Sequence, residues 1–404
     1  MSRFLLLSAS MGAGHDAACT ELTHRLHAAG HESVRLDLLR MLPGPTGAGL
    51  RRFYHLIIRR APIVYSGIYA AFFHPGEGPR PGSTPLAALA EPRLLEAVER
   101  SRADAIVSLF HLGAQLTGRA RARGRLAVPC ATLVTDFAVH RQWLHPGNDL
   151  NLCLTEPNAR QARRAVGRPS AVYGPLVPER FRPNPPGEAL WRTRLAGRGP
   201  AVVISTGAWG AGSGFAQTAG LLLEAGYRPV VLCGNDVRLR RRLAAAVPGA
   251  KTLGWVEDMP GLLAASAALL DNAAGQTALQ ALAVGVPVIG WRPIPGHGVA
   301  GVRRMAQLGL TDHATTADEL VQLLDERTLS ASAAALPAAS ASTPSGTSAA
   351  TSAEVQAPAG AARPWARAEA GEHERERGAA VRGLMEADVI GPLESMLGGD
   401  LTLW

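Results

Sequence analysis

The segment 272–289 constrains the fold more than any other part of the chain. The run Asn272-Ala-Ala-Gly-Gln-Thr277, followed by apolar stretches at 278–286 and 287–289, predicts a strand end, a tight glycine turn, a helix and a second strand. Such a turn leaves several backbone N–H groups unpaired at the positive end of the helix dipole, which suits a phosphate or diphosphate. The Thr277 hydroxyl adds a further donor. Many α/β proteins have this turn without a ligand, so a purely structural role stays open.

Short apolar runs alternate with helical patterns along residues 1–175. The predicted strands are Phe4–Leu7, Ser33–Asp37, Ala105–Leu109, Ala131–Val134, Leu150–Leu154 and Ala171–Tyr173. Helical patterns lie between them, for example at 92–101 and 157–166. This alternation is typical of a doubly wound parallel sheet.

The same pattern restarts near Pro200. A strand at Ala201–Ser205 leads into the glycine-rich loop 206–214, and a further strand is predicted at Arg228–Cys233. We therefore expect a second doubly wound α/β domain over residues 176–329. Residues 330–362 are rich in Ala, Ser and Pro and predict a disordered insertion, because they bury too little apolar surface to offset the entropy of ordering. Residues 363–404 form a C-terminal segment in which apolar side chains recur at helical spacing.

Composition narrows the class of protein. A chain of 404 residues with 47% hydrophobic residues is long enough for two α/β domains. No apolar run reaches 18 residues without a charge, and neither a transmembrane helix nor a signal peptide is predicted. Cys19, Cys130, Cys153 and Cys233 lack metal-ligand spacing and are interpreted as reduced thiols of a cytoplasmic protein. The net charge of +8 favours an anionic partner, but we find no nucleic-acid-binding motif.

Three motifs in the second half resemble a known family. They are Gly254-Trp-Val-Glu-Asp-Met259-Pro260, the turn 272–277 and Arg292-Pro-Ile-Pro-Gly296. Together they resemble the donor half of family 28 glycosyltransferases, which include monogalactosyldiacylglycerol synthases and bacterial processive diacylglycerol glucosyltransferases. The resemblance implies the GT-B architecture, in which two Rossmann-like domains face a cleft, with a hinge at 173–181.

The resemblance also assigns the donor side. The residues that it implies for binding the UDP-sugar are Gly207, Gly210, Gly234, Asn235, Trp255, Val256, Met259, Asn272, Gly275, Gln276, Thr277, Gln280, Pro295 and Gly296. Two departures from the family's pattern leave the donor sugar open. Relatives place a glutamate where Gln280 stands, and they continue with Gln-Glu where this chain has His297 and Gly298. Loss of the carboxylate weakens a charge-assisted hydrogen bond to the ribose.

The acceptor side is assigned to the first domain, residues 1–175. Gly12 and Gly14 of the loop 8–15 let an acceptor head group approach the backbone. In the segment 133–146, His140 and Trp143 are implied to bind the acceptor.

An inverting sugar transfer needs a base that accepts the proton of the acceptor hydroxyl. His15 and Asp136 are the candidates for this catalytic role, and the sequence does not choose between them. Asp136 follows an apolar run and therefore falls at the carboxyl edge of a sheet, where ligands bind in open α/β folds. A water-facing position for His15 and a helix N-cap role for Asp136 are the alternatives.

Residues 50–73 are the strongest membrane feature. Arg51, Arg52, Arg59 and Arg60 alternate with Phe53 and other apolar side chains, a pattern that suits the surface of an anionic leaflet. The resemblance implies that this region lies beside the lipid acceptor. An ordinary amphipathic helix packed on its own sheet is the alternative. Pro62 is expected to break the helix.

These observations favour a peripheral enzyme on the inner face of the cell membrane. It would be an inverting glycosyltransferase that moves galactose or glucose from a UDP-sugar to diacylglycerol or a related lipid. No cofactor or metal ion is expected, because the helix dipole and backbone donors would stabilise the leaving diphosphate. Two other classes stay open. One is a UDP-sugar enzyme that acts on a polyprenyl lipid or small molecule, or an epimerase, and the other is a non-catalytic cleft protein.

Overall fold

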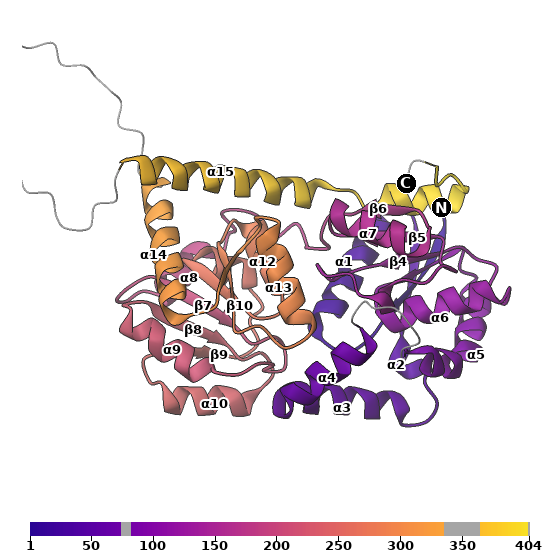
Figure 1. Cartoon of the computed structure of the whole chain (residues 1–404), viewed down its shortest axis with the longest axis horizontal. Helices are drawn as coiled ribbons and strands as arrows, with labels where there is room; N and C mark the ends of the chain where they lie inside the picture. The colour runs from indigo at the N-terminus through magenta and orange to yellow at the C-terminus, as the bar shows by residue number, and fades with distance from the viewer. Residues whose placement is uncertain (74–81, 335–363, 403–404) are drawn as a thin grey trace, which may run out of the picture.

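The protein is built around two parallel six-stranded sheets (Figure 1). The computed structural model describes residues 1–73, 82–334 and 364–402. The first sheet has the strand order β2-β1-β3-β4-β5-β6, and the second has the order β12-β11-β10-β7-β8-β9. Every strand pair is parallel, so each half is doubly wound as the sequence predicts.

The strands of the first sheet are the predicted ones, shifted by at most one residue at either end. They are β1 (Arg3–Ser8), β2 (Glu32–Asp37), β3 (Ala105–Ser108), β4 (Cys130–Leu133), β5 (Leu150–Cys153) and β6 (Ser170–Val172). The helices of this half are α1 (Ala13–Ala28), α2 (Leu38–Met41), α3 (Thr46–Arg60), α4 (Pro62–Phe72), α5 (Thr84–Ser101), α6 (His111–Ala122), the short 3-10 helix η1 (Arg141–Trp143) and α7 (Glu156–Val166).

Side chains of β1 alternate between two separate cores. Leu5 and Leu7 belong to the core shared with α2, α5 and α6, whereas Phe4 and Leu6 belong to the core shared with α1. Successive side chains of a strand point to opposite faces of the sheet. A strand that is apolar at every position must therefore be covered on both faces. This double burial explains why the run reads as continuously hydrophobic.

The second half repeats this arrangement. Its strands are β7 (Ala201–Ser205), β8 (Arg228–Leu232), β9 (Lys251–Leu253), β10 (Ala268–Asp271), β11 (Val288–Trp291) and β12 (Asp312–Ala314). Its helices are α8 (Glu188–Arg194), α9 (Phe215–Glu224), α10 (Val237–Ala246), α11 (Met259–Ala264), α12 (Gln276–Val284), α13 (His297–Gln307) and α14 (Ala317–Ala334). The expected end of this domain at residue 329 falls inside α14, which continues to Ala334.

The C-terminal segment crosses back to the first half (Figure 1). It forms α15 (Pro364–Glu386) and α16 (Ile390–Gly398) rather than one helix, and Asp388 accepts hydrogen bonds from the first N–H groups of α16. Arg327 and Arg377 both pair with Asp312 and hold α15 against the second half. Leu393 and Met396 of α16 are buried in the core that contains β1. The predicted disordered insertion lies outside the described residues from 335 on, and its first residues belong to α14.

Both halves of the molecule form hydrogen bonds to the predicted hinge at 173–181. Arg25 of α1 donates hydrogen bonds to the carbonyls of Pro175 and Val177 at 3.0 and 3.2 Å. Gln276 of α12 donates to the carbonyl of Leu176 at 2.8 Å. The helices α1 and α12 therefore meet at this hinge, close to the cleft. Within the described ranges, no helix is long and apolar enough to cross a membrane.

Candidate active site

A cleft with a volume of about 1080 Å³ separates the two halves. Both predicted catalytic residues and most of the other predicted site residues line it. These residues are Gly12, Gly14, His15, Phe53, Arg59, Asp136, His140, Trp143, Gly207, Gly234, Trp255, Val256, Met259, Asn272, Gly275, Gln276, Thr277 and Gln280. The tertiary structure thus brings together segments that are more than 250 residues apart in the chain.

The predicted phosphate turn lies between β10 and α12. The carboxylate of Asp271 accepts hydrogen bonds from the N–H groups of Ala273 and Ala274 at 2.9 and 2.5 Å, which closes the turn. Burial raises the pKa of Asp271, and these backbone hydrogen bonds lower it. The left-handed position is Ala274, with φ of 53°, and not the expected glycine.

Gly275 serves another purpose in this turn. It is the N-cap of α12 in an extended conformation, and no side chain caps the helix. A Cβ atom built on Gly275 would meet nothing within 4 Å, so no other part of the described chain packs against this side of the helix start. Uncapped N–H groups at a helix start bind anions. The geometry therefore fits the diphosphate site that the sequence predicts.

The start of α1 faces the start of α12. A Cβ atom built on Gly14 would lie 3.6 Å from the Cβ of Gln276, so the two helices approach closely here. Gly12 is the N-cap of α1, again without a side-chain cap and with open space over it. The cleft consequently has two uncapped helix starts, one from each half.

His15 lies within the first turn of α1 and faces the cleft interior rather than water. Its ring packs edge-on against Phe110 with the centroids 5.3 Å apart, and its buried Nδ1 has no hydrogen-bond partner among the described residues. Burial lowers the pKa of His15, while the charges of Asp136 and Asp16 raise it. The imidazole is therefore neutral at pH 7 and able to accept a proton.

Asp136 follows β4 and caps no helix. Its Oδ2 accepts a hydrogen bond from the indole N–H of Trp143 at 2.8 Å and lies 3.7 Å from Nε2 of His140. Trp143 and His140 were predicted to bind the acceptor, but they are only 1% and 6% exposed. Burial lowers the pKa of His140 well below its usual value. Both side chains therefore line the cleft wall and orient the carboxylate.

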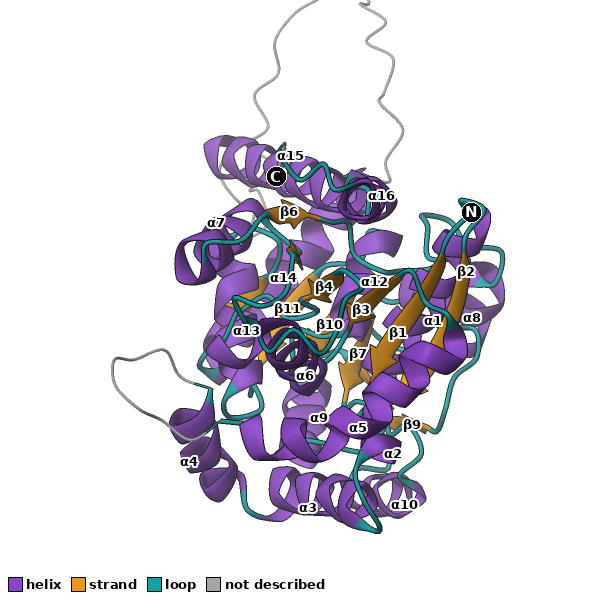
Figure 2. Cartoon of the chain, turned by 90° about the vertical axis from the view of Figure 1, so that its right-hand side faces the viewer, coloured by secondary structure: helices purple, strands orange, loops and turns teal. Residues whose placement is uncertain are grey.

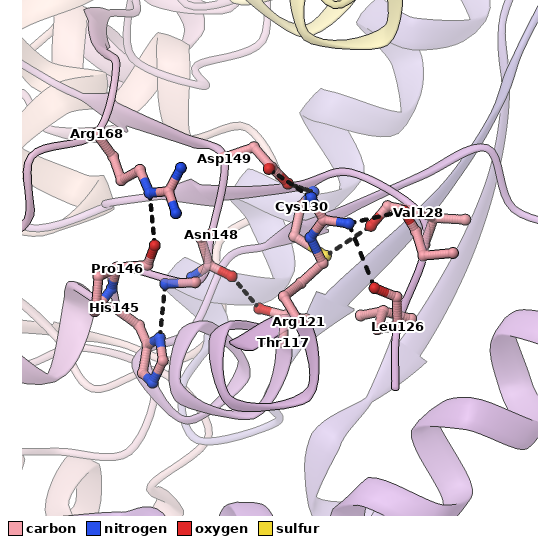
Figure 3. Close-up of polar contacts among 12 residues, drawn as sticks. Thr117, Arg121, Leu126, Val128, Cys130, His145, Pro146, Asn148, Asp149 and Arg168 are labelled. Atoms are coloured by element: carbon pink, nitrogen blue, oxygen red, sulfur yellow. Dashed lines mark hydrogen bonds and ion pairs between the residues drawn. The ribbon is translucent and has the colours of Figure 1, made fainter. Parts of the chain in front are cut away.

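The far end of the loop that carries Asp136 is anchored on α6 (Figure 3). Thr117 donates a hydrogen bond to Asn148 at 2.9 Å, and Asn148 donates to the carbonyl of Ala114 at 2.9 Å. Asp149 accepts from Arg121 at 2.6 Å and from the N–H of Cys130 at 2.8 Å. These contacts fix the C-terminal end of the segment 134–149 on α6 and β4.

The structure adds site residues that sequence analysis missed. Tyr54, Tyr65 and Tyr69 from α3 and α4, together with His111, join Asp136 and His140 along the cleft. Burial raises the pKa of Tyr69 to about 12 and lowers that of His111 to about 3. The spacing of four between Tyr65 and Tyr69, which places them on one helix face, was the available signal.

His297 connects the two halves within this cluster. Its Nδ1 lies 2.8 Å from the hydroxyl of Tyr65, and the two rings are nearly perpendicular. Burial lowers the pKa of His297, and the charge of Asp136 raises it. The position that departs from the family's pattern therefore reaches across to the acceptor half.

Several predicted residues lie elsewhere. Gly210, Asn235, Pro295 and Gly296 do not line the cleft. Gly296 is instead packed against the ring of Tyr69, and Gly210 against Leu239 and Asp236. Arg59 lines the cleft but pairs with Asp236 of the second half.

The predicted membrane segment bends at its proline, because α3 ends at Arg60 and α4 begins at Pro62, as expected. Its buried side chains Ile57 and Ile58 pack with Tyr65 in a small separate core, with Ala211 of the second half against them. The end of α3 therefore packs on α4 and on the second half, whereas Leu50 near its start packs against the core of the first half. Arg51 and Arg52 are exposed, and the side chain of Arg60 lies outside the described ones.

The fold and the cleft define the class first. The glycosyltransferase SsfS6 of Streptomyces sp. SF2575 superposes with a TM-score of 0.54 at 12% identity, covering 98% of this chain and 100% of that chain. HepE of Anabaena, solved in complex with UDP-glucose, superposes with a TM-score of 0.52 at 12% identity, covering 100% of both chains. The chain thus has the GT-B glycosyltransferase fold.

Sequence comparison then narrows the class. Residues 15–174 match the family model of monogalactosyldiacylglycerol (MGDG) synthase. A processive diacylglycerol beta-glucosyltransferase of Staphylococcus carnosus is 27% identical over 210 residues, which cover 50% of this chain and 54% of that protein. The match therefore spans about half the length of this curated relative. The resemblance to family 28 glycosyltransferases, inferred from three motifs, is confirmed.

Proposed function

We propose that the protein is an inverting glycosyltransferase that moves a hexose from a UDP-sugar to diacylglycerol or a related lipid. The observation that carries this proposal is that two helix N-termini with different chemical groups lie in one cleft. The start of α12 offers uncapped backbone donors, and the start of α1 offers His15 beside Asp136. The relative named above is a processive diacylglycerol beta-glucosyltransferase, and HepE was solved with UDP-glucose in a related fold.

The acceptor side of the cleft suits a lipid. The wall formed by α3, α4 and α5 is apolar, and its lining side chains are Leu50, Phe53, Tyr54, Ile57, Ile58, Tyr65, Ile68, Tyr69, Phe72, Phe73 and Leu86. Apolar walls with few polar groups are typical of sites for hydrophobic ligands. The acyl chains would lie along this wall, with the free hydroxyl directed toward His15 and Asp136.

The proposed chemistry is a single displacement. The acceptor hydroxyl oxygen attacks the anomeric carbon of the hexose as the bond from that carbon to the β-phosphate oxygen breaks. His15, neutral before the reaction, accepts the hydroxyl proton, and Asp136 stabilises the imidazolium that forms. The leaving diphosphate carries away the bonding electrons, and the N–H groups of α12 stabilise its charge without a metal ion.

The experiment is mass spectrometry of lipids after incubation with diacylglycerol and either UDP-glucose or UDP-galactose. We expect a hexosyl-diacylglycerol that disappears in the Asp136→Asn and His15→Gln variants. Absence of product with both donors, from a protein that binds UDP normally, would remove diacylglycerol as the acceptor.

A second function has specific support. Gln280 lines the cleft where relatives have glutamate, and His297 is tied to Tyr65 where relatives have Gln-Glu. These positions favour a donor whose nucleotide is not UDP, used in the same apolar cleft. Competition binding with a panel of nucleoside diphosphates tests this second function, and strongest binding by UDP would argue against it.

A further inference from the structure

The helix α10 of the donor half continues the surface formed by α3 of the acceptor half. Both views place the two helices next to each other along the lower edge of the molecule (Figures 1 and 2). Arg59, near the end of α3, pairs with Asp236, which is the N-cap of α10. The ion pair therefore joins the two helices at the boundary between the halves.

The exposed side of α10 is strongly basic. Leu239 and Leu243 are its buried residues, and they pack in the core of the second half. The exposed arginines are Arg238, Arg240, Arg241 and Arg242. Neither α3 nor α10 contains an acidic residue, and the N-cap Asp236 is occupied by Arg59. With Arg52 of α3, these residues form a basic surface, which we name the basic edge, whereas Arg51 lines a separate pocket together with Asp37 and Glu96.

Apolar side chains are exposed along the same edge. Ile63 at the start of α4 is 86% exposed, and Val237 at the start of α10 is 49% exposed. Phe53, Leu56 and Val64 are also about half exposed or more. The ring of Trp209 lies 5.2 Å from that of His55 on α3 and is partly exposed as well. Exposed aliphatic side chains such as Ile63 and Val237 gain free energy in a lipid interface, and they offer no ring on which a nucleobase could stack.

We propose that α10 is the second half of a membrane-docking surface, so that both domains bind an anionic lipid bilayer through the basic edge. Charge complementarity with an anionic leaflet and the exposed apolar groups together select this partner. Docking through α3 alone would leave the donor half free to rotate relative to the acceptor half. Docking through both helices holds the cleft in the arrangement that the Arg59–Asp236 pair makes. This inference rests on the proposed action at a membrane but not on the identity of the sugar or lipid.

The test is co-sedimentation of the full chain with phosphatidylcholine vesicles that contain or lack phosphatidylglycerol. We compare the double variant Arg238→Glu/Arg241→Glu with Arg160→Glu/Arg164→Glu on α7, a helix that Figures 1 and 2 show toward the opposite, upper side. Both variants change the net charge equally. Partitioning onto anionic vesicles is expected to fall about tenfold or more for the α10 variant, since each basic residue near the surface contributes measurably. The α7 variant is expected to bind like the unaltered protein.

Equal binding by the two double variants would overturn the inference. Binding of the unaltered protein to an oligonucleotide but not to vesicles would also overturn it, and would assign the basic edge to nucleic acid. Transfer to diacylglycerol in uncharged detergent micelles is measured in parallel, because it does not need the charged surface. Micellar activity that persists in the α10 variant separates failure of this inference from failure of the proposed function.

Discussion

The two halves share one topology, but they present different chemistry to the cleft. The first half directs titratable and aromatic side chains inward, such as His15, Asp136 and Tyr69. The second half adds the uncapped start of α12 at Gly275, together with side chains such as Trp255 and Gln280. This difference shows that the same strand–loop–helix unit presents titratable side chains to the cleft in one half and an uncapped helix start in the other. His297 is a side chain from the second half that joins the cluster of the first.

The sharpest test of this division removes a charge from the first half. Asp136→Asn is expected to lower kcat by about 10²–10⁴-fold, because His15 then lacks the charge that stabilises its imidazolium, and a positioned acid–base group contributes that much. UDP affinity is expected to stay within twofold, since the nucleotide would contact the other half. The measurement combines single-turnover kinetics with calorimetric titration of UDP. A variant that retained turnover would take Asp136 out of catalysis.

A matched pair of glycine substitutions separates the two helix starts. Gly275→Ala and Gly12→Ala each add a methyl group into open space, so neither is expected to disturb folding. Gly275→Ala is expected to weaken UDP binding about 10–100-fold, because hydrogen bonds to a charged diphosphate contribute about 1.5–3 kcal/mol each. Gly12→Ala is expected to leave UDP binding unchanged and to raise KM for the acceptor.

The control for this pair is Gly220→Ala in α9, which also meets open space but lies in a helix interior. It is expected to change neither affinity, and to stabilise the fold slightly through the lower entropy of the unfolded chain. Equal loss of UDP affinity at Gly12 and Gly275 would show that the two helix starts do not divide the ligands.

Gln280→Glu sharpens the comparison within the donor half. Restoring a carboxylate is expected to increase UDP affinity about 5–30-fold, because a charge-assisted hydrogen bond to the ribose is about 1–2 kcal/mol stronger than a neutral one. Titration with UDP and with uridine, which both carry the ribose, is the measurement. Unchanged affinity for both would place the ribose away from Gln280.

The smallest expected effect concerns pH. Burial lowers the pKa of His15, His111 and His140, that of His111 to about 3. In the unfolded chain these groups titrate near the ordinary value of about 6.5, so below that pH the unfolded state binds protons that the folded state does not. Stability is therefore present above about pH 6.5 and is lost progressively as the pH falls toward 3. Calorimetric Tm values at about pH 7, 6 and 5 measure this loss of stability. His111→Gln is expected to flatten the decline, and an identical slope would contradict this assignment.

Much of the fold was predictable because its strands are buried on both faces. The runs at Phe4–Leu7 and 201–204 are hydrophobic throughout, and a parallel strand covered on both faces accommodates such a run. The predicted break at Pro62 followed from the missing N–H of proline. The left-handed residue of the phosphate turn was not predictable, because Asp271 stabilises it at Ala274 instead of at a glycine.

The sequence by itself determined the two doubly wound sheets, the uncapped helix starts and the presence of His15 and Asp136, because these depend on local pattern and spacing. Only the tertiary structure decided that Trp143 and His140 contact Asp136, that Tyr65 meets His297, and that Arg59 pairs with Asp236. The last two contacts join residues more than 150 positions apart. These contacts form because the two halves pack together around the cleft. No local sequence pattern specifies how separate domains meet.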